Sequence, residues 1–287
     1  MDPYRARLYT PQELYAGMEE AGYDGTVDAR AYAWSQDAAL RHDAYVSALR
    51  AIHDDAMSDA LAAVVERRHV VGVMGGHALR RGTDDYASAA LLGHRLAQAG
   101  ALVVTGGGPG AMEAANLGAW APDPATLAAT LARVEPVPDF AADIAAWAAP
   151  ALLARRELGA DQPQRLRSVG IPTWYYGHEP PNAFAQLVAK FFSNALREDL
   201  LLAHSRAGLV VLPGAAGTVQ EVFQMATRLY YGVDEQVAPL VLIGTEHWTT
   251  HLPVWPLLQA LSRDRPMARA LHLVGTVDEA AEVLTGG

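Results

Sequence analysis

The sequence predicts an α/β fold: a doubly wound parallel sheet of the Rossmann-like type, preceded by a helical extension. Three observations support this prediction. From residue 69 onward, short apolar segments rich in β-branched residues alternate with amphipathic helical segments, and three of the apolar segments end in glycine turns. Strands that are apolar throughout are typical of parallel sheets covered on both faces, and strand–helix alternation is typical of parallel connections.

Residues 1–68 are predicted to form the N-terminal helical extension. Thr10, Pro11 and Glu13 supply an N-cap residue, a proline at the first helical position and a glutamate at the third, which together make a capping box. Asp28 is a candidate cap for a longer helical stretch that reaches about Arg68. No residue pattern in this extension resembles a site, so its expected role is as a scaffold or an oligomer contact.

Residues 69–287 are predicted to form the nucleotide-binding domain. An alanine- and proline-rich insertion of two short helices, about 120–167, could cover the site or build an interface. Apolar residues at helical spacing predict further helices over 86–99, from about 111, over 182–204 and over 218–231. The expected strands are Val70–Met74, Ala101–Thr105, Val169–Tyr175, Leu209–Leu212, Pro239–Ile243 and Leu271–Val274.

Composition argues against several classes of function. The chain has 22 Lys and Arg against 32 Asp and Glu, a net charge of −10, so no nucleic acid polymer or anionic membrane is expected as a partner. The absence of cysteine excludes disulfides, thiolate zinc sites and cysteine nucleophiles. Residues 1–9 are polar and charged, unlike a signal peptide, and the apolar runs are strand-sized. A cytoplasmic location is therefore expected.

Three predicted strands end in glycine turns at one edge of the sheet: Gly75–Gly76, Gly106–Gly110 and Gly214–Thr218. Glycines let backbone N–H groups approach an anion closely, and a helix N-terminus adds donors and partial positive charge. The turns match neither the P-loop pattern nor G-x-G-x-x-G, so neither triphosphate hydrolysis nor dinucleotide binding is supported. Steric needs alone also explain glycine in a tight strand–helix turn, and this alternative stays open for each turn taken singly.

Arg197 and Glu221 are the candidate functional side chains near the last turn. Arg197 shares the polar stripe of its predicted helix with Lys190, and Glu221 lies in the first turn of a helix predicted to begin at Thr218. Both have a structural alternative. Thr218 and Glu221 have the spacing of a capping box, and Arg197 beside Glu198 could form a surface ion pair.

A further candidate segment, residues 174–182, follows the third predicted strand. Its aromatic residues, His178 and Glu179 could stack a base and bind its edge, whereas a proline-bounded loop with its aromatic residues in the core is the alternative. His178 and Glu179 are adjacent, which is not metal-ligand spacing, so no metal site is expected.

Two motifs together resemble the LOG (Lonely Guy) family, often labelled lysine-decarboxylase-like: TGGGPGAMEAANLGA at Thr105–Ala119 and REDLLLAHSRAGLVVLPGAAGTVQE at Arg197–Glu221. They are similar to the family's GGGxxGxM and PGGxGTxxE turns, and the resemblance spans about residues 70–275. It implies a Rossmann-like homodimer or larger homo-oligomer. It also implies an enzyme without a resident cofactor that cleaves the N-glycosidic bond of nucleoside 5′-monophosphates, releasing base and ribose 5-phosphate.

The resemblance implies roles for individual residues. Glu221 would position water and stabilise an oxocarbenium-like ribose, and Arg197 would fix the substrate and polarise its leaving side. Backbone groups of two glycine turns would bind phosphate, and residues at the other strand ends would contact the rest of the substrate. The implied phosphate-binding residues are Gly107, Gly108, Gly214, Ala215, Ala216, Gly217 and Thr218, and the implied substrate-binding residues are Gly75, Gly76, Met112, Glu113 and His178.

The chain departs from the family pattern at two positions. Ala215 replaces the second glycine of PGGxGT, and its backbone can still donate to an anion if its φ is negative. Glu198 follows Arg197 where cytokinin-activating enzymes usually carry lysine. Both departures concern specificity for cytokinin nucleotides more than nucleotide binding.

The decarboxylase label does not suit this chain. Pyridoxal phosphate enzymes need a lysine for the Schiff base, and the single lysine, Lys190, is expected on a helix stripe away from the strand ends. The alternative to a hydrolase is a sensor or carrier that binds a nucleotide or a phosphorylated cofactor without turnover, since relatives of this fold carry molybdenum cofactor. A third possibility is an interaction protein that acts through its N-terminal helices.

Overall fold

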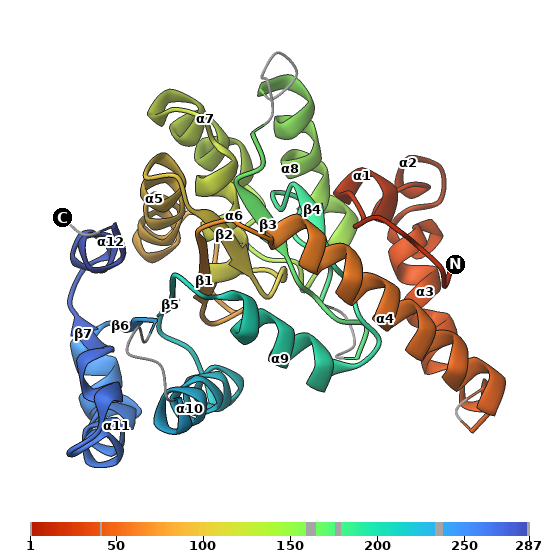
Figure 1. The fold of residues 1–287 in the computed structure, drawn as a ribbon. Coiled ribbons are helices and arrows are strands. Elements are labelled where there is room, and N and C mark those ends of the chain that lie inside the picture. Colours follow the sequence, from red (N-terminus) through yellow and green to blue (C-terminus); the bar gives the residue numbers. More distant parts are fainter. Residues whose placement is uncertain (1, 41, 159–164, 176–178, 233–237, 286–287) are drawn as a thin grey trace.

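The computed structural model describes residues 2–40, 42–158, 165–175, 179–232 and 238–285. It has one seven-stranded parallel sheet of order β4-β3-β2-β1-β5-β6-β7, which confirms the predicted doubly wound α/β fold (Figure 1). The strands are β1 (Val70–Met74), β2 (Leu102–Thr105), β3 (Ser168–Gly170), β4 (Leu187–Val188), β5 (Gly208–Val211), β6 (Leu240–Ile243) and β7 (Leu271–Val274).

Helices precede, connect and cover these strands. Across the described residues, none combines the length and apolar character that crossing a membrane requires. The helices are α1 (Pro11–Leu14), α2 (Met18–Ala21), α3 (Val27–Gln36), α4 (Ala44–Val65), α5 (Asp84–Gln98), α6 (Ala111–Trp120), α7 (Pro124–Val134), α8 (Ile144–Leu158), α9 (Asn194–His204), α10 (Ala216–Tyr231), α11 (Val254–Ser262) and α12 (Val277–Thr285).

Two hydrophobic cores lie on opposite faces of the sheet, because successive strand residues point to opposite sides. In β1, Val70 and Met74 belong to the core shared with α4, α9, α10 and α11, whereas Val71 and Val73 belong to the core shared with α5, α6, α7 and α12. All five β1 residues are buried. The apolar character of the strands therefore follows from coverage on both faces.

The prediction of one helix over residues 182–204 is wrong in its first half. Residues 187–188 form β4, which pairs with β3, and Tyr9 donates its backbone N–H to the Val188 carbonyl at 2.9 Å. The helix α9 begins only at Asn194, where the Ser193 side chain accepts a hydrogen bond from the Leu196 N–H at 3.3 Å. Pairing at the sheet edge outweighs the helical spacing of the apolar residues in this segment.

The capping box in the N-terminal extension is confirmed, but the predicted role of Asp28 is wrong. Thr10 and Glu13 form the reciprocal capping bonds at the start of α1. Thr26 caps α3 and Asp43 caps α4, so the stretch that Asp28 was expected to begin consists of two helices.

Asp28 instead joins the N-terminal extension to the sheet through a buried ion pair. Its carboxylate accepts from Lys190 Nζ at 2.7 Å, from Trp174 Nε1 at 2.8 Å and from the Tyr23 hydroxyl at 2.7 Å. Both charged side chains are 1% exposed. Lys190 lies in the extended segment after β4, not on a helix as expected, and burial lowers its pKa while Asp28 opposes that change.

The insertion forms α7 and α8, which pack against each other beside α5 and α6 (Figure 1). Arg155 of α8 is buried and donates to the carbonyls of Ala183 and Ala185, the latter at 2.7 Å. The insertion is thereby tied to the segment that leads into β4.

Replacing Lys190 by Met should lower the free energy of unfolding by about 3–5 kcal/mol, because the Asp28 carboxylate would stay buried without its cation. Urea unfolding at pH 7 measures the change. The matched control is Arg228→Met, which removes the exposed 2.7 Å pair with Asp199 and should cost less than about 1 kcal/mol. Equal losses in the two variants would contradict the role assigned to the buried pair.

Candidate functional site

A cavity of about 710 Å³ opens at the carboxyl ends of the central strands, within the ~300–1,000 Å³ typical of small-molecule sites. The strand order reverses between β1 and β5, and ligands of open α/β sheets bind at such a switch point. Many of the predicted site residues line it. They are Gly75, Gly76, Gly108, Met112, Arg197, Gly214, Ala215, Ala216, Gly217, Thr218 and Glu221.

The start of α10 presents backbone donors to this cavity. The helix begins at Ala216, and its first intrahelical bond runs from the Val219 N–H to the Ala215 carbonyl at 3.0 Å. The N–H groups of Ala216, Gly217 and Thr218 thus have no acceptor within the helix. Together with the helix dipole, these donors suit an anion.

The predicted capping box at Thr218 is wrong, because α10 begins two residues earlier than expected. Thr218 lies inside the first turn, and the N-cap residue Ala215 makes no side-chain cap bond. Glu221 therefore has no capping role, which removes the structural alternative considered for it.

The departure at Ala215 leaves the turn geometry accessible to a non-glycine residue. Ala215 has φ −111°, the negative value on which backbone donation was predicted to depend. Gly214 is the position where a side chain would clash, since a Cβ there would lie 2.1 Å from the Thr218 hydroxyl oxygen.

Arg197 and Glu221 meet in this cavity, from α9 and α10. Arg197 Nη1 lies 3.5 Å from Glu221 Oε1, with the side chains 9% and 15% exposed. Arg197 Nη2 donates to Asn194 Oδ1 at 2.8 Å, whereas its buried Nε has no hydrogen-bond partner. The ion pair with Glu198 considered for Arg197 is present, but it is buried and not on the surface, and the guanidinium keeps one unused donor.

Burial raises the pKa of Glu221 to about 7, from an ordinary value of 4.5. The Arg197 guanidinium lowers this pKa, and the neighbouring Glu198 and Glu179 carboxylates raise it. A carboxylate with a pKa near neutrality suits general acid–base chemistry.

Glu198 is held beside this pair by side-chain amides. Its carboxylate accepts from Asn194 Nδ2 at 2.7 Å, from Gln220 Nε2 at 2.9 Å and from Gln224 Nε2 at 3.3 Å. It also lies 3.7 Å from Arg197 Nη2. Glu198 thus shares the guanidinium with Glu221.

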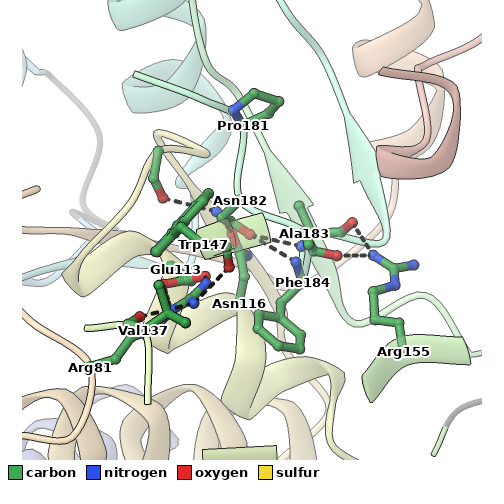
Figure 2. Close-up of polar contacts among 12 residues, drawn as sticks. Arg81, Glu113, Asn116, Val137, Trp147, Arg155, Pro181, Asn182, Ala183 and Phe184 are labelled. Carbon is green, nitrogen blue, oxygen red and sulfur yellow. Dashed lines mark hydrogen bonds and ion pairs between the residues drawn. The ribbon is translucent and has the colours of Figure 1, made fainter. Parts of the chain in front are cut away.

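The first glycine-rich turn, Gly106–Gly110, is fixed from behind by two buried asparagines. Asn182 Nδ2 donates to the Gly108 carbonyl at 3.1 Å and to Asn116 Oδ1 at 3.0 Å (Figure 2). The Gly107 N–H donates to the Thr105 hydroxyl at 3.0 Å, so this N–H is already used within the turn. Gly108 lines the cavity and Gly107, predicted to bind phosphate, does not.

Glu113, a predicted substrate-binding residue, does not line the cavity, because its side chain is bound to the Arg81 guanidinium. It is fully buried and receives Arg81 Nε at 3.0 Å and Arg81 Nη2 on its other oxygen (Figure 2). Arg81 also donates to the Trp147 carbonyl at 2.8 Å, which links α6 to α8. Both carboxylate oxygens of Glu113 are thus occupied.

Two histidines of the cavity lining, His77 and His247, were not singled out as site residues. His77 is paired with Glu179 of the candidate segment 174–182, with Nδ1 and Oε1 3.4 Å apart. His247 lies after β6, with Nε2 3.1 Å from the Gly214 carbonyl. The position of His77 directly after Gly75–Gly76 was a usable signal. His247 offered none, because its approach depends on the β5–β6 pairing.

Two further expectations concern His178, predicted to bind substrate, and the insertion, which was expected either to cover the site or to build an interface. His178 lies outside the described residues. Among the described residues of the insertion, 120–158 and 165–167, none lines the cavity.

Two family models match the chain. The model described as "SLOG cluster4 family" matches residues 68–128, and the one described as "Possible lysine decarboxylase" matches residues 154–286. The first segment contains the turn Gly106–Gly110, and the second contains Arg197 and Glu221. These matches confirm the predicted resemblance to the LOG family.

Solved structures give a weaker likeness. The chain is similar to the molybdenum cofactor binding protein from the phototrophic bacterium Rippkaea orientalis, with 17% identity, a TM-score of 0.44, and coverage of 77% of this chain and 98% of that chain. It is equally similar to the Moco carrier protein from Chlamydomonas reinhardtii, with 17% identity, a TM-score of 0.44, and coverage of 77% and 97%. No curated protein matches at a significant level. At these values the two structures carry no inference about what this chain binds.

Replacing Glu221 by Gln should stabilise the protein increasingly as pH rises. The folded protein favours the protonated carboxyl, because its pKa is raised to about 7. The associated stability is therefore present below pH 4.5 and is lost as pH rises through 7. The free energy of unfolding of Glu221→Gln relative to the unaltered protein should rise by about 3 kcal/mol in total between these limits.

Urea unfolding at pH 5, 6, 7 and 8 measures this difference. Glu282→Gln, at an exposed position of α12, is the matched control. A pH-independent difference for Glu221→Gln would contradict the raised pKa.

Proposed function

We propose that the protein hydrolyses the N-glycosidic bond of a nucleoside 5′-monophosphate, releasing the free base and ribose 5-phosphate. The observation that carries this proposal is the nearly buried pair of Arg197 and Glu221, which lies in one cavity with the donor-rich start of α10. An anion-binding turn beside a carboxylate of raised pKa is the combination that this reaction needs.

The start of α10 would bind the 5′-phosphate. The N–H groups of Ala216, Gly217 and Thr218 are free of intrahelical acceptors, and the helix dipole favours a dianion there. The Arg197 guanidinium, from the same cavity lining, adds a positive charge. Backbone donors and one arginine suffice for a single phosphate, which agrees with the acidic net charge of −10.

Glu221 would act on water. As the C1′–N bond breaks, the electron pair of that bond leaves with the base, and positive charge develops on the ribose. The carboxylate accepts a proton from water, and the water oxygen bonds to C1′. A pKa of about 7 leaves a substantial ionised fraction at neutral pH while keeping the group basic.

The single lysine supports no decarboxylase. Lys190 is 1% exposed, is paired with Asp28 and is not part of the described cavity lining. A Schiff base there would first require breaking a buried ion pair. A homodimer or larger homo-oligomer, which the resemblance implies, and a cytoplasmic location, which the polar N-terminal residues favour, are part of the same proposal.

Glu221→Gln should lower turnover by about 10²–10⁴-fold, because the amide cannot accept the proton from water, and should leave nucleotide binding largely intact. Release of ribose 5-phosphate from a panel of nucleoside 5′-monophosphates measures turnover, and calorimetry measures binding. Glu282→Gln is the control with full activity. Binding by the unaltered protein without any release would favour the sensor or carrier instead.

The pH dependence of kcat/KM should have an acidic limb near pH 7. Glu221 must be ionised to act as a base, and its pKa in the free protein is raised to about 7. Activity should fall about tenfold per pH unit below that value. A profile that stays flat down to pH 5 would contradict the assignment of Glu221 as the base.

A further inference from the structure

His77 and Glu179 form a second acid–base pair in the same cavity. Their Nδ1 and Oε1 atoms are 3.4 Å apart, and the side chains are 59% and 34% exposed. Both line the cavity, and neither has a role in binding phosphate or activating water in the proposed reaction. The pair is therefore free to act on another part of the substrate.

The strand order places this pair on the β3 side of the phosphate turn, with His77 next to that turn and Glu179 farther from it. The phosphate turn follows β5, His77 follows β1 and Glu179 follows the β3 segment, in the sheet order β3-β2-β1-β5. Adjacent strands are about 4.8 Å apart, so β3 and β5 are separated by roughly 14 Å. A nucleotide with its phosphate on α10 would extend its base toward β3.

The turn Gly106–Gly110 lies between the two charged groups. A Cβ on Gly108 would lie 3.4 Å from Glu179 Oε2, and a Cβ on Gly106 would lie 3.6 Å from Arg197 Nη1. The Glu179 carboxylate and the Arg197 guanidinium thus approach the same glycine surface. A substrate resting on this surface would contact Arg197 with one part and the His77–Glu179 pair with another.

A departing purine needs a proton, and neither Glu221 nor Arg197 supplies it in the proposed reaction. Glu221 takes a proton from water, and an arginine does not release one. His247, also in the described cavity lining, has its Nε2 on the Gly214 carbonyl of the phosphate turn. Histidine is the side chain used most often for proton transfer near neutral pH, and a carboxylate on one ring nitrogen orients the other toward a substrate. In His77, Nδ1 faces Glu179, which leaves Nε2 for the substrate.

We propose that His77, oriented by Glu179, protonates the leaving base. This inference rests on the proposed hydrolase function. The proton moves from His77 Nε2 to a ring nitrogen of the base as the C1′–N bond breaks, and the electron pair of that bond stays with the base. Water forms the new bond to C1′ and gives its proton to Glu221. Solvent then returns a proton to His77 and takes one from Glu221.

A pair of substrates that differ in their need for a proton tests this proposal. One is the purine nucleoside 5′-monophosphate that the unaltered protein cleaves fastest, and the other is its N7-methylated derivative, whose base leaves neutral without protonation. His77→Asn should lower kcat/KM at least about 100-fold on the first substrate and less than about threefold on the second. Glu179→Gln should show the same selectivity with a smaller loss.

The control is His251→Asn. His251 Nε2 lies 3.6 Å from Glu246 Oε1 in another exposed pair, and neither residue belongs to the described cavity lining. It should leave both substrates unaffected. Equal losses on both substrates in His77→Asn would assign the pair to binding and overturn the proton-transfer role. Cleavage of pyrimidine nucleotides alone would overturn the inference by itself. Cleavage of no nucleotide would overturn the proposed function and the inference with it.

Discussion

Coverage of the sheet on both faces is the constraint on which the rest of the molecule depends. Every residue of β1, β2, β5 and β6 is buried, so these strands carry apolar side chains toward both cores. The polar side chains that line the cavity consequently lie in the turns beyond the strand ends and near the starts of α9 and α10. The reversal of strand order between β1 and β5 then separates the connections at one edge, and the cavity lies there. The glycine turns follow from the same constraint, since backbone must turn sharply into helices that pack closely on the sheet.

The N-terminal extension is attached to the sheet by a buried ion pair between Asp28 and Lys190, which is an unusual interaction for a protein core. A lysine and an aspartate that are each 1% exposed would be costly to bury singly. Trp174 and Tyr23 also donate to Asp28, so its buried carboxylate has three donors. Trp174 lies directly after Thr173, a residue of the cavity lining. The extension thus contributes to the position of the segment that forms one side of the cavity.

Sequence patterns predicted what depends on local spacing and missed what depends on long-range pairing. Six of the seven strands, and the helices α5, α6 and α10, follow from runs of apolar residues and were predicted, although β3 ends at Gly170 and not at Tyr175 as expected. The two-residue strand β4 was not, because it is specified by β3 and Tyr9 rather than by its own residues. The same limit applies to the site. The meeting of Arg197 with Glu221 was implied by family motifs, whereas the pairing of Glu113 with Arg81 is separated by 32 positions and left no local signal.

The departure at Glu198 has a physical consequence for the neighbouring glutamate. Enzymes of the family that act on cytokinin nucleotides usually carry lysine after the arginine, which would place a second cation near Arg197. Here a carboxylate lies 3.7 Å from Arg197 Nη2 and competes with Glu221 for the guanidinium. Its charge raises the pKa of Glu221 in the same direction as burial does. A cation at this position would favour the ionised form and lower that pKa, giving a weaker base. Glu198 therefore adds to the effect of burial and helps to keep the Glu221 carboxyl a weak acid.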